Sequence, residues 1–235
     1  MAALVQRFGL DVFAQYAEGA QLFETAQGEV IRDQGFASMQ GSLRVLGGMA
    51  AIVDMLVAGL PEGCIETGRG VQSVTGAGEI CFADGDGLSF DRIVMALPPR
   101  VAATVQFTPE LEPSVRSALQ SIPTWMAGHA KLVAVFETAF WRDAGFSGDA
   151  SSQVGPMVEI HDASADTNGA LFGFLGVPAA ARAGQRDAVI AASVAQLTRL
   201  FGPKAAAPFD VFYTDWAEEA QTAVAADREP LRHHP

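Results

Sequence analysis

The segment from His129 to Phe136 constrains the fold more than any other part of the sequence. It reads His-Ala-Lys-Leu-Val-Ala-Val-Phe and is apolar apart from its first residue and Lys131. In a β-strand every second side chain points to the same face, so Lys131 shares a face with Val133 and Val135, and the other face is wholly apolar. An ammonium group in such a strand is costly to bury, so Lys131 needs water, a counter-charge or a chemical task. The structural alternative is a lysine on an edge strand that extends into solvent.

Short motifs surround this strand in a characteristic order. Gly47 and Gly48 precede a helical pattern, a Leu-Pro-Pro segment ends at Pro99, Phe140-Trp141 places a tryptophan ten residues after Lys131, and Asp215-Trp216 follows much later. In this order and spacing, residues 42 to 235 resemble the middle of the flavin-dependent amine oxidases, the monoamine oxidase and L-amino-acid oxidase group. The resemblance implies an oxidoreductase that uses FAD to oxidise a C–N bond of a small amine or amino-acid-like substrate.

The resemblance also implies roles for individual residues. Lys131 would reach toward the flavin N5 through a water molecule and assist reoxidation by oxygen, as a fixed cation can stabilise a developing anion. Gly47 and Gly48 would allow the backbone to approach the cofactor, and Val71 would hold the adenine end of FAD through its backbone. Trp216 would line the substrate cavity.

Each of these residues also has a purely structural interpretation. Gly47 and Gly48 would serve as a plain entry turn to a helix, and Val71 as an ordinary hairpin residue. Trp216 would close a core after a strand. Ala226 stands where many family members have a cavity tyrosine, which argues against an aromatic cage around the amine.

A dinucleotide-binding fingerprint is absent from the sequence. Three Gly-x-Gly segments occur, but Ser73, Cys81 and Phe90 occupy the third glycine position of Gly-x-Gly-x-x-Gly. The family's C-terminal flavin segment is missing as well. We therefore expect the central portion of an oxidase, inactive alone and not holding FAD tightly. The alternative is a non-catalytic α+β binding domain derived from that fold.

Composition excludes several other functions. The net charge is −12 and no basic cluster occurs, which argues against nucleic acid as a partner. No run of 18 apolar residues predicts a membrane span, and the N-terminus lacks the pattern of a signal peptide. Two cysteines without metal spacing predict reduced thiols and a cytoplasmic location. The four histidines show no helical metal-binding pair, so no metal site is expected.

Hydrophobic periodicity predicts the elements. Helices are expected over 3–17, 49–59, 113–122 and 185–201, and strands over 65–67, 71–75, 79–83, 89–95, 129–136, 154–160, 170–175 and 209–214. Residues 18–45 receive no firm assignment. The helix over 185–201 should pack a stripe of Ile190, Val194, Leu197 and Phe201 onto the sheet that contains Lys131.

Together these elements predict an α+β fold, a mixed sheet covered by helices. The expected parts are an N-terminal helical and irregular section of the substrate domain over 1–45, a partial FAD-domain segment of short strands and one helix over 46–100, and a substrate-binding domain over 101–235. The crossover between the last two should lie near Pro98 to Val101, where proline interrupts any strand.

Overall fold

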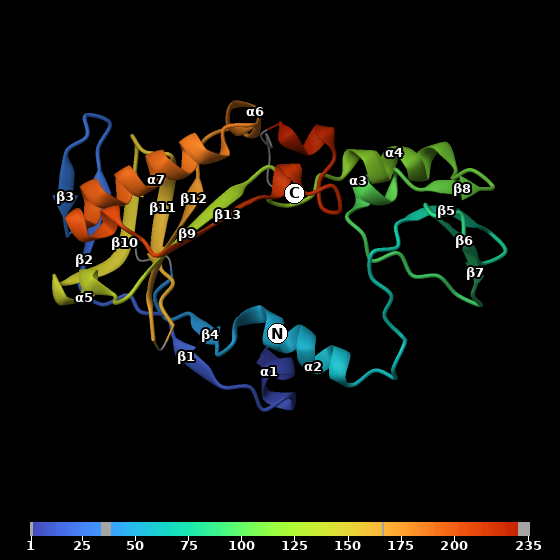
Figure 1. Cartoon of the computed structure of the whole chain (residues 1–235). Helices are drawn as coiled ribbons and strands as arrows, with labels where there is room; N and C mark the ends of the chain where they lie inside the picture. Colours follow the sequence, from blue (N-terminus) through green and yellow to red (C-terminus); the bar gives the residue numbers. More distant parts are fainter. Residues whose placement is uncertain (1, 34–38, 166, 230–235) are drawn as a thin grey trace. The chain divides into compact units, whose positions relative to one another are not determined.

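The computed structural model describes residues 2–33, 39–165 and 167–229 (Figure 1). These residues divide into two compact units. Unit 1 comprises residues 1–60, 130–177 and 181–214, and unit 2 comprises 61–129, 178–180 and 215–235. The assignment of 1–45, 46–100 and 101–235 to functional domains stays a prediction.

Unit 1 contains a seven-stranded sheet in the order β13-β9-β12-β11-β10-β2-β3. β10 and β2 are parallel, whereas β2–β3, β10–β11, β11–β12 and β12–β9 are antiparallel. The strands are β2 (Ala20–Glu24), β3 (Val30–Arg32), β9 (Ala130–Phe136), β10 (Phe146–Ser152), β11 (Met157–Asp162), β12 (Gly169–Leu175) and β13 (Asp210–Asp215). This sheet confirms the expected mixed α+β architecture.

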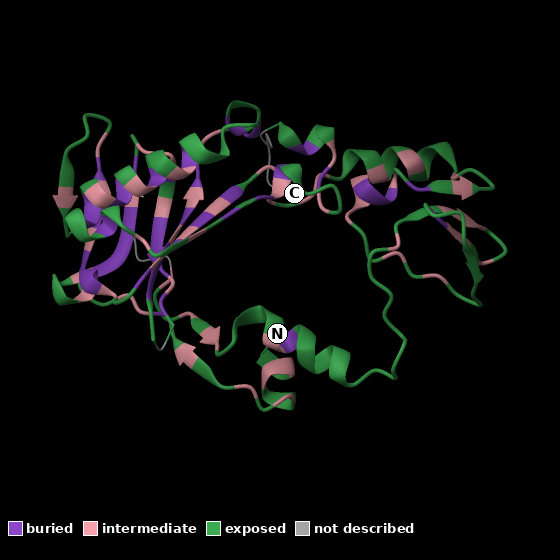
Figure 2. Cartoon of the chain, in the orientation of Figure 1, coloured by how far each residue is buried: buried purple, intermediate pink, exposed green. Residues whose placement is uncertain are grey.

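The predicted alternation of β9 is confirmed. Ala130, Leu132, Ala134 and Phe136 are buried, and the residues between them are half-buried. Figure 2 shows this alternation of buried and intermediate residues along β9. β9 lies between β13 and β12, so the structural alternative, a lysine on an edge strand, is wrong.

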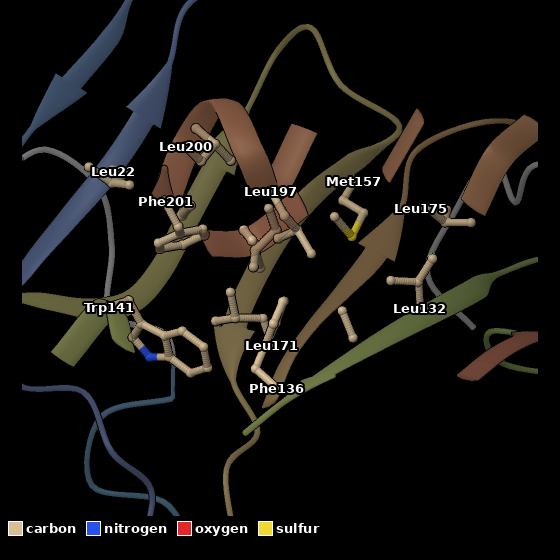
Figure 3. Packing of buried hydrophobic residues seen from close by; sticks show 14 of the residues in the cluster. Leu22, Leu132, Phe136, Trp141, Met157, Leu171, Leu175, Leu197, Leu200 and Phe201 are labelled. Atoms are coloured by element: carbon tan, nitrogen blue, oxygen red, sulfur yellow. The ribbon is translucent and has the colours of Figure 1, made fainter. Parts of the chain in front are cut away.

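One face of this sheet is covered by helix α7 (Arg186–Phe201) (Figure 1). Leu197 and Phe201 point from α7 toward Leu171 and Trp141, as Figure 3 shows. The predicted packing of this helix is therefore confirmed, but the buried stripe is rotated. Val189, Ser193, Gln196 and Leu200 are buried with Leu197 and Phe201, whereas Ile190 and Val194 are only half-buried.

Gln196 explains part of this rotation. Its side chain accepts a hydrogen bond from the Met157 backbone N–H (3.0 Å) and donates one to the Met157 backbone carbonyl (2.8 Å), so a polar residue is satisfied inside the interface.

The rest of unit 1 consists of short elements: α1 (Ala2–Arg7), β1 (Val12–Ala14), β4 (Leu43–Val45), α2 (Gly48–Ala58), α5 (Phe140–Asp143), α6 (Ala179–Arg182, shared with unit 2) and η1 (Pro203–Ala206). β1 and β4 pair as a separate two-stranded sheet. The helix predicted over 3–17 is wrong beyond Arg7, since Gly9 has a left-handed φ of 62° and the chain then enters β1.

Unit 2 contains a four-stranded sheet in the order β7-β6-β5-β8, made of β5 (Val71–Thr75), β6 (Glu79–Phe82), β7 (Gly87–Ser89) and β8 (Gln106–Thr108). It also holds α3 (Pro99–Ala102), α4 (Pro113–Ser121), η2 (Trp216–Glu218) and η3 (Ala225–Arg228). The strands predicted near 71–75 and 79–83 and the helix at Pro113 are confirmed. Residues 65–67 and 93–95 are not in strands. No helix among the described residues combines the length and apolar character needed to cross a membrane.

Candidate functional site

Lys131 lies on the face of the large sheet opposite α7. The register pairs Lys131 with Phe174 of β12, and Phe172 occupies the same face two residues earlier. The Lys131 Nζ lies 4.6 Å from the ring centroid of Phe174 and 4.8 Å from that of Phe172. Both rings therefore bind the ammonium group through cation–π interactions.

Burial lowers the pKa of Lys131 below its usual value. Desolvation disfavours the charged form of the side chain. When Lys131 is protonated, its surroundings of low polarity screen the charge less than water would, so it interacts more strongly with nearby groups than a solvated surface lysine does.

The same face continues from Phe172 to a histidine held between two carboxylates. The register pairs His161 of β11 with Phe172, and their ring centroids are 5.2 Å apart. The His161 Nδ1 lies 2.7 Å from Asp149 Oδ1, and its Nε2 lies 2.8 Å from Glu159 Oε1. Both ring nitrogens face acceptors, so this geometry fits the doubly protonated imidazolium.

Burial alone lowers the pKa of His161, but the hydrogen bonds to Asp149 and Glu159 outweigh it and raise the pKa above its usual value. A pKa raised by folding stabilises the folded state fully below about pH 6.5, the value of an unfolded histidine. That stabilisation is lost as the pH rises through the higher folded pKa.

We therefore expect the free energy of unfolding of the wild-type chain to fall with rising pH above about 6.5, and expect His161→Gln to weaken this dependence. Urea titrations at a series of pH values measure the effect, and NMR titration of the His161 ring measures its pKa. His129→Gln, at an exposed position, is the matched control and should follow the wild type. A His161 midpoint at or below about pH 6.5 would contradict the expectation.

A second polar network lies on the opposite side of β11 and fixes the sheet to α5. Asp162 accepts hydrogen bonds from the indole Nε1 of Trp141 (2.9 Å), from Nε and Nη2 of Arg142 (2.8 and 2.9 Å) and from the Ser164 backbone N–H (2.7 Å). Trp141 is fully buried, and its ring packs edge-on against Phe136 and Phe140. Trp141 therefore anchors the chain where β9 turns toward β10.

Comparison with known proteins identifies the family. A family model described as flavin containing amine oxidoreductase matches residues 3–234. The chain belongs to this family.

The similar proteins are amine oxidases. The probable flavin-containing monoamine oxidase A of Dictyostelium discoideum is 28% identical over 183 residues, which make up 75% of this chain and 40% of that protein. The putative flavin-containing monoamine oxidase AofH of Mycobacterium tuberculosis (strain ATCC 25618 / H37Rv) is 31% identical over 153 residues, 61% of this chain and 32% of that protein. The chain therefore spans well under half the length of these curated relatives.

Solved structures agree on the fold. Wild-type putrescine oxidase bound to putrescine matches with a TM-score of 0.78 at 18% identity, covering 95% of this chain and 73% of that chain. Cyclohexylamine oxidase from Brevibacterium oxydans matches with a TM-score of 0.77 at 17% identity, covering 94% and 71%. At this identity the likeness shows a shared fold.

In this member of the flavin amine oxidase family, Gly47 and Gly48 form the entry to α2. Both have left-handed φ values, 79° and 74°, and a Cβ at Gly48 would meet no atom within 4 Å. The backbone here is open to close approach by a flat group, which fits one contact of a flavin. The same geometry begins a helix, so the cofactor role of Gly47 and Gly48 stays a prediction.

Val71 and Trp216 belong to unit 2, whereas Lys131 belongs to unit 1. Val71 begins β5 with 40% of its surface exposed. The Trp216 backbone N–H donates to the His129 carbonyl (3.1 Å) at the start of η2, and its side chain is half-buried. Their roles at the adenine end of FAD and in the substrate cavity stay predictions.

These residues meet part of what the binding of FAD requires. The open backbone at Gly48 and the cation at Lys131 fit a flavin, whereas the sequence contains no Gly-x-Gly-x-x-Gly turn for its pyrophosphate. Among the residues described, no cluster of three or more histidine, cysteine or acidic side chains is arranged to hold a metal ion.

Asp149, Glu159 and His161 do not stand out in the sequence as functional candidates, and no strand is predicted over residues 146–152. The alternation of Glu159 and His161 in a strand was the available signal, but their partner Asp149 lies in a polar segment, Phe-Ser-Gly-Asp-Ala-Ser-Ser, without a strand pattern.

Proposed function

We propose that this chain forms the substrate-domain portion of an FAD-dependent amine oxidase whose complete form oxidises the C–N bond of a small amine. The observation that carries the proposal is the placement of Lys131. It is half-buried in a central strand, on the face that α7 leaves uncovered, in a member of this family.

FAD would supply the hydride acceptor, and Lys131 the fixed positive charge beside it. Lys131 contacts Phe172 and Phe174, so its ammonium group has a defined position, unlike that of a flexible, solvated lysine. Such a preorganised charge stabilises negative charge that develops as electrons pass to oxygen. Gly47 and Gly48 would let the backbone approach the flavin ring.

We also propose that the 235 residues alone retain little FAD. This is supported by the missing pyrophosphate fingerprint and by the share of the relatives' length that the chain spans. A helix N-terminus with free backbone N–H groups supplies most of the anchoring for two phosphates in dinucleotide sites.

The test compares the chain alone with a chimera in which it is placed between the flanking segments of the Dictyostelium relative. We expect the chain alone to purify without flavin, and the chimera to bind FAD and lose its flavin absorbance when an amine is added without oxygen. If the chain alone bound FAD stoichiometrically, the proposal that these 235 residues retain little FAD would be wrong. A flavin-loaded chimera that no amine reduces would overturn the proposed activity.

A further inference from the structure

The Gly47–Gly48 turn lies at the end of a two-stranded sheet that is separate from the seven-stranded sheet of Lys131. β4 pairs with β1, and the turn follows β4 and leads into α2 (Figure 1). Among the described residues, strand pairing does not join β1 or β4 to the seven-stranded sheet. The position of the turn relative to Lys131 therefore depends on the connecting chain segments and on side chains that contact both sheets.

Arg44 is the first of these side chains. It lies opposite Phe13 in the two-stranded sheet, and its Cζ is 5.3 Å from the centroid of the Phe13 ring. Its Nη1 donates a hydrogen bond to the backbone carbonyl of Ser164 (2.8 Å), which follows β11 of the large sheet. Burial lowers the pKa of Arg44, and attraction to Asp162 opposes this shift. The guanidinium group thus has a ring, an acceptor and a counter-charge around it, which together define its position.

Gln15 makes the second connection between the two sheets. It is only 6% exposed, and its backbone N–H donates to the Ser42 carbonyl (2.9 Å), next to β4. Its side-chain Nε2 donates to the backbone carbonyls of Tyr16 (3.0 Å) and Asp162 (2.6 Å). Both N–H groups of this buried amide therefore have acceptors. The side chain links the chain just after β1 to the last residue of β11.

The residues that accept these two connections are themselves fixed in the large sheet. The Asp162 carboxylate accepts hydrogen bonds from Trp141, Arg142 and the Ser164 backbone N–H. The Cζ of Arg142 also lies 3.9 Å from the ring centroid of Tyr16, which adds a third contact between the sheets. Trp141 in turn packs against the last residue of β9. A continuous set of contacts therefore runs from the two-stranded sheet to β9.

We propose that Arg44 and Gln15 are positioning residues that set the distance between the Gly47–Gly48 turn and Lys131. The inference rests on the proposed function, in which the backbone of this turn and the ammonium of Lys131 both approach the flavin ring. Groups that act on one ligand must hold their positions to within about 0.5 Å, and the residues behind them maintain this precision. The two glycines have no side chains with which to hold the turn in place, so neighbouring residues must do so.

The first measurement needs no flavin and uses the complete 235-residue chain. Spin labels at Asp54→Cys in α2 and Ala195→Cys in α7, both exposed positions, allow double electron–electron resonance to measure the distance between these helices. Cys64 and Cys81 are replaced by serine, so that only the two introduced thiols react. Because α2 follows the turn directly and α7 packs on the seven-stranded sheet, the distance distribution reports how firmly the turn is held.

We expect a narrow distribution in the labelled parent chain and one about twofold broader in Arg44→Met, because fewer contacts then hold the turn. Methionine keeps an apolar side chain beside Phe13 but has neither the charge nor the donor. Arg44→Lys keeps the charge without the planar guanidinium, so its distribution should have an intermediate width. Arg7→Met is the matched control. Arg7 is exposed in α1, with its Cζ 6.0 Å from the Phe8 ring centroid, and its loss should leave the distribution unchanged.

Gln15→Leu keeps the test decisive should Arg44→Met fail to fold, which circular dichroism detects. Leucine is similar to glutamine in size but cannot donate a hydrogen bond to Asp162, so this variant should broaden the distribution as well. Unchanged distributions in Gln15→Leu and in every folded variant of Arg44 would overturn the inference.

The second measurement uses the chimera and distinguishes positioning from stability. Arg44→Met should raise the Kd for FAD about tenfold, the effect of losing about one hydrogen bond. It should also change the intensity of the visible circular dichroism of the bound flavin, whereas Arg7→Met should change neither quantity. A broader distance distribution with an unchanged Kd and flavin spectrum would refute the positioning role, since the two residues would then serve stability alone.

The two measurements separate this inference from the proposed function. Unchanged distance distributions in the chain, together with an amine-oxidising chimera, would refute only the positioning role. Broadened distributions and weaker FAD binding, in a chimera that no amine reduces, would refute only the proposed oxidase.

Discussion

Replacing Asp162 by alanine should lower the free energy of unfolding by about 3 kcal/mol, the lower part of the range for breaking a buried ion pair. The Asp162 carboxylate is 1% exposed and accepts four hydrogen bonds, two of them from Arg142. Its removal would leave the buried Trp141 indole N–H and the Ser164 backbone N–H without acceptors. The 32% exposure of Arg142 limits the loss, because water can solvate part of the guanidinium.

Urea unfolding followed by circular dichroism measures this change. Asp210→Ala, at an exposed position in β13, is the matched control and should change the stability by no more than about 0.5 kcal/mol. Asp162→Asn keeps the shape and one oxygen acceptor, so its loss should be intermediate. A loss below about 1 kcal/mol for Asp162→Ala would show that the network merely replaces equivalent bonds to water.

Strand β9 and helix α7 show which features of the fold can be predicted from sequence patterns. β9 and α7 carry strong periodic signals, and both elements were predicted to within a residue or so. For α7, however, periodicity selected Ile190 and Val194, whereas the structure buries Ser193 and Gln196. A hydrophobic pattern cannot identify that face, because the face includes the polar residue Gln196. The burial of Gln196 is compensated by its two hydrogen bonds with the Met157 backbone.

β10 is the clearest case of a strand that the sequence does not reveal. Its residues are small or polar, yet Ser147, Asp149 and Ser152 are buried. The two serines find partners far away in the chain. Ser147 Oγ donates to the Ala20 carbonyl (3.3 Å), Ser152 Oγ donates to Glu24 (2.6 Å), and Glu24 in turn accepts from Arg199 of α7 (2.9 Å). Only the assembled sheet supplies these partners, so a local pattern cannot indicate the strand.

Helix α2 shows the opposite discrepancy. Its existence over nearly the predicted residues is confirmed, and Ile52, Met55 and Leu56 have the i, i+3, i+4 spacing of one helix face. Ile52 is buried, whereas Met55 and Leu56 are at least 40% exposed, and Figure 2 shows the helix as largely exposed. Periodicity therefore predicted the helix correctly, although the described residues do not cover its apolar face.

Only part of the candidate site could be predicted from the sequence. Lys131 could be singled out because one charge interrupts an apolar strand, and that argument needs no knowledge of the neighbours. The aromatic pair that holds it could not, since Phe172 and Phe174 become its neighbours only through the β9–β12 register. Asp149 and His161 depend on the pairing of β10 with β11 in the same way.

Replacing Lys131 by methionine in the flavin-loaded chimera should slow reoxidation by oxygen about a hundredfold, the effect of removing one preorganised charge from a site of developing negative charge. Methionine keeps a long apolar side chain against Phe172 and Phe174 but carries no charge. Reduction of the flavin by the amine should change much less, because that step does not use the cation in the proposed mechanism. Anaerobic stopped-flow measurements separate the two half-reactions.

Lys204→Met is the matched control, since Lys204 is exposed in η1, and both half-reactions should keep wild-type rates in that variant. The pKa of Lys131 gives a readout that needs no flavin. NMR titration of the isolated chain should find the pKa of Lys131 below the usual value of a lysine, because burial lowers it. Equal reoxidation rates in the wild type and Lys131→Met would assign Lys131 a structural role: it would then serve to position Phe172 and Phe174, and the charge required for oxygen reactivity would have to come from another group.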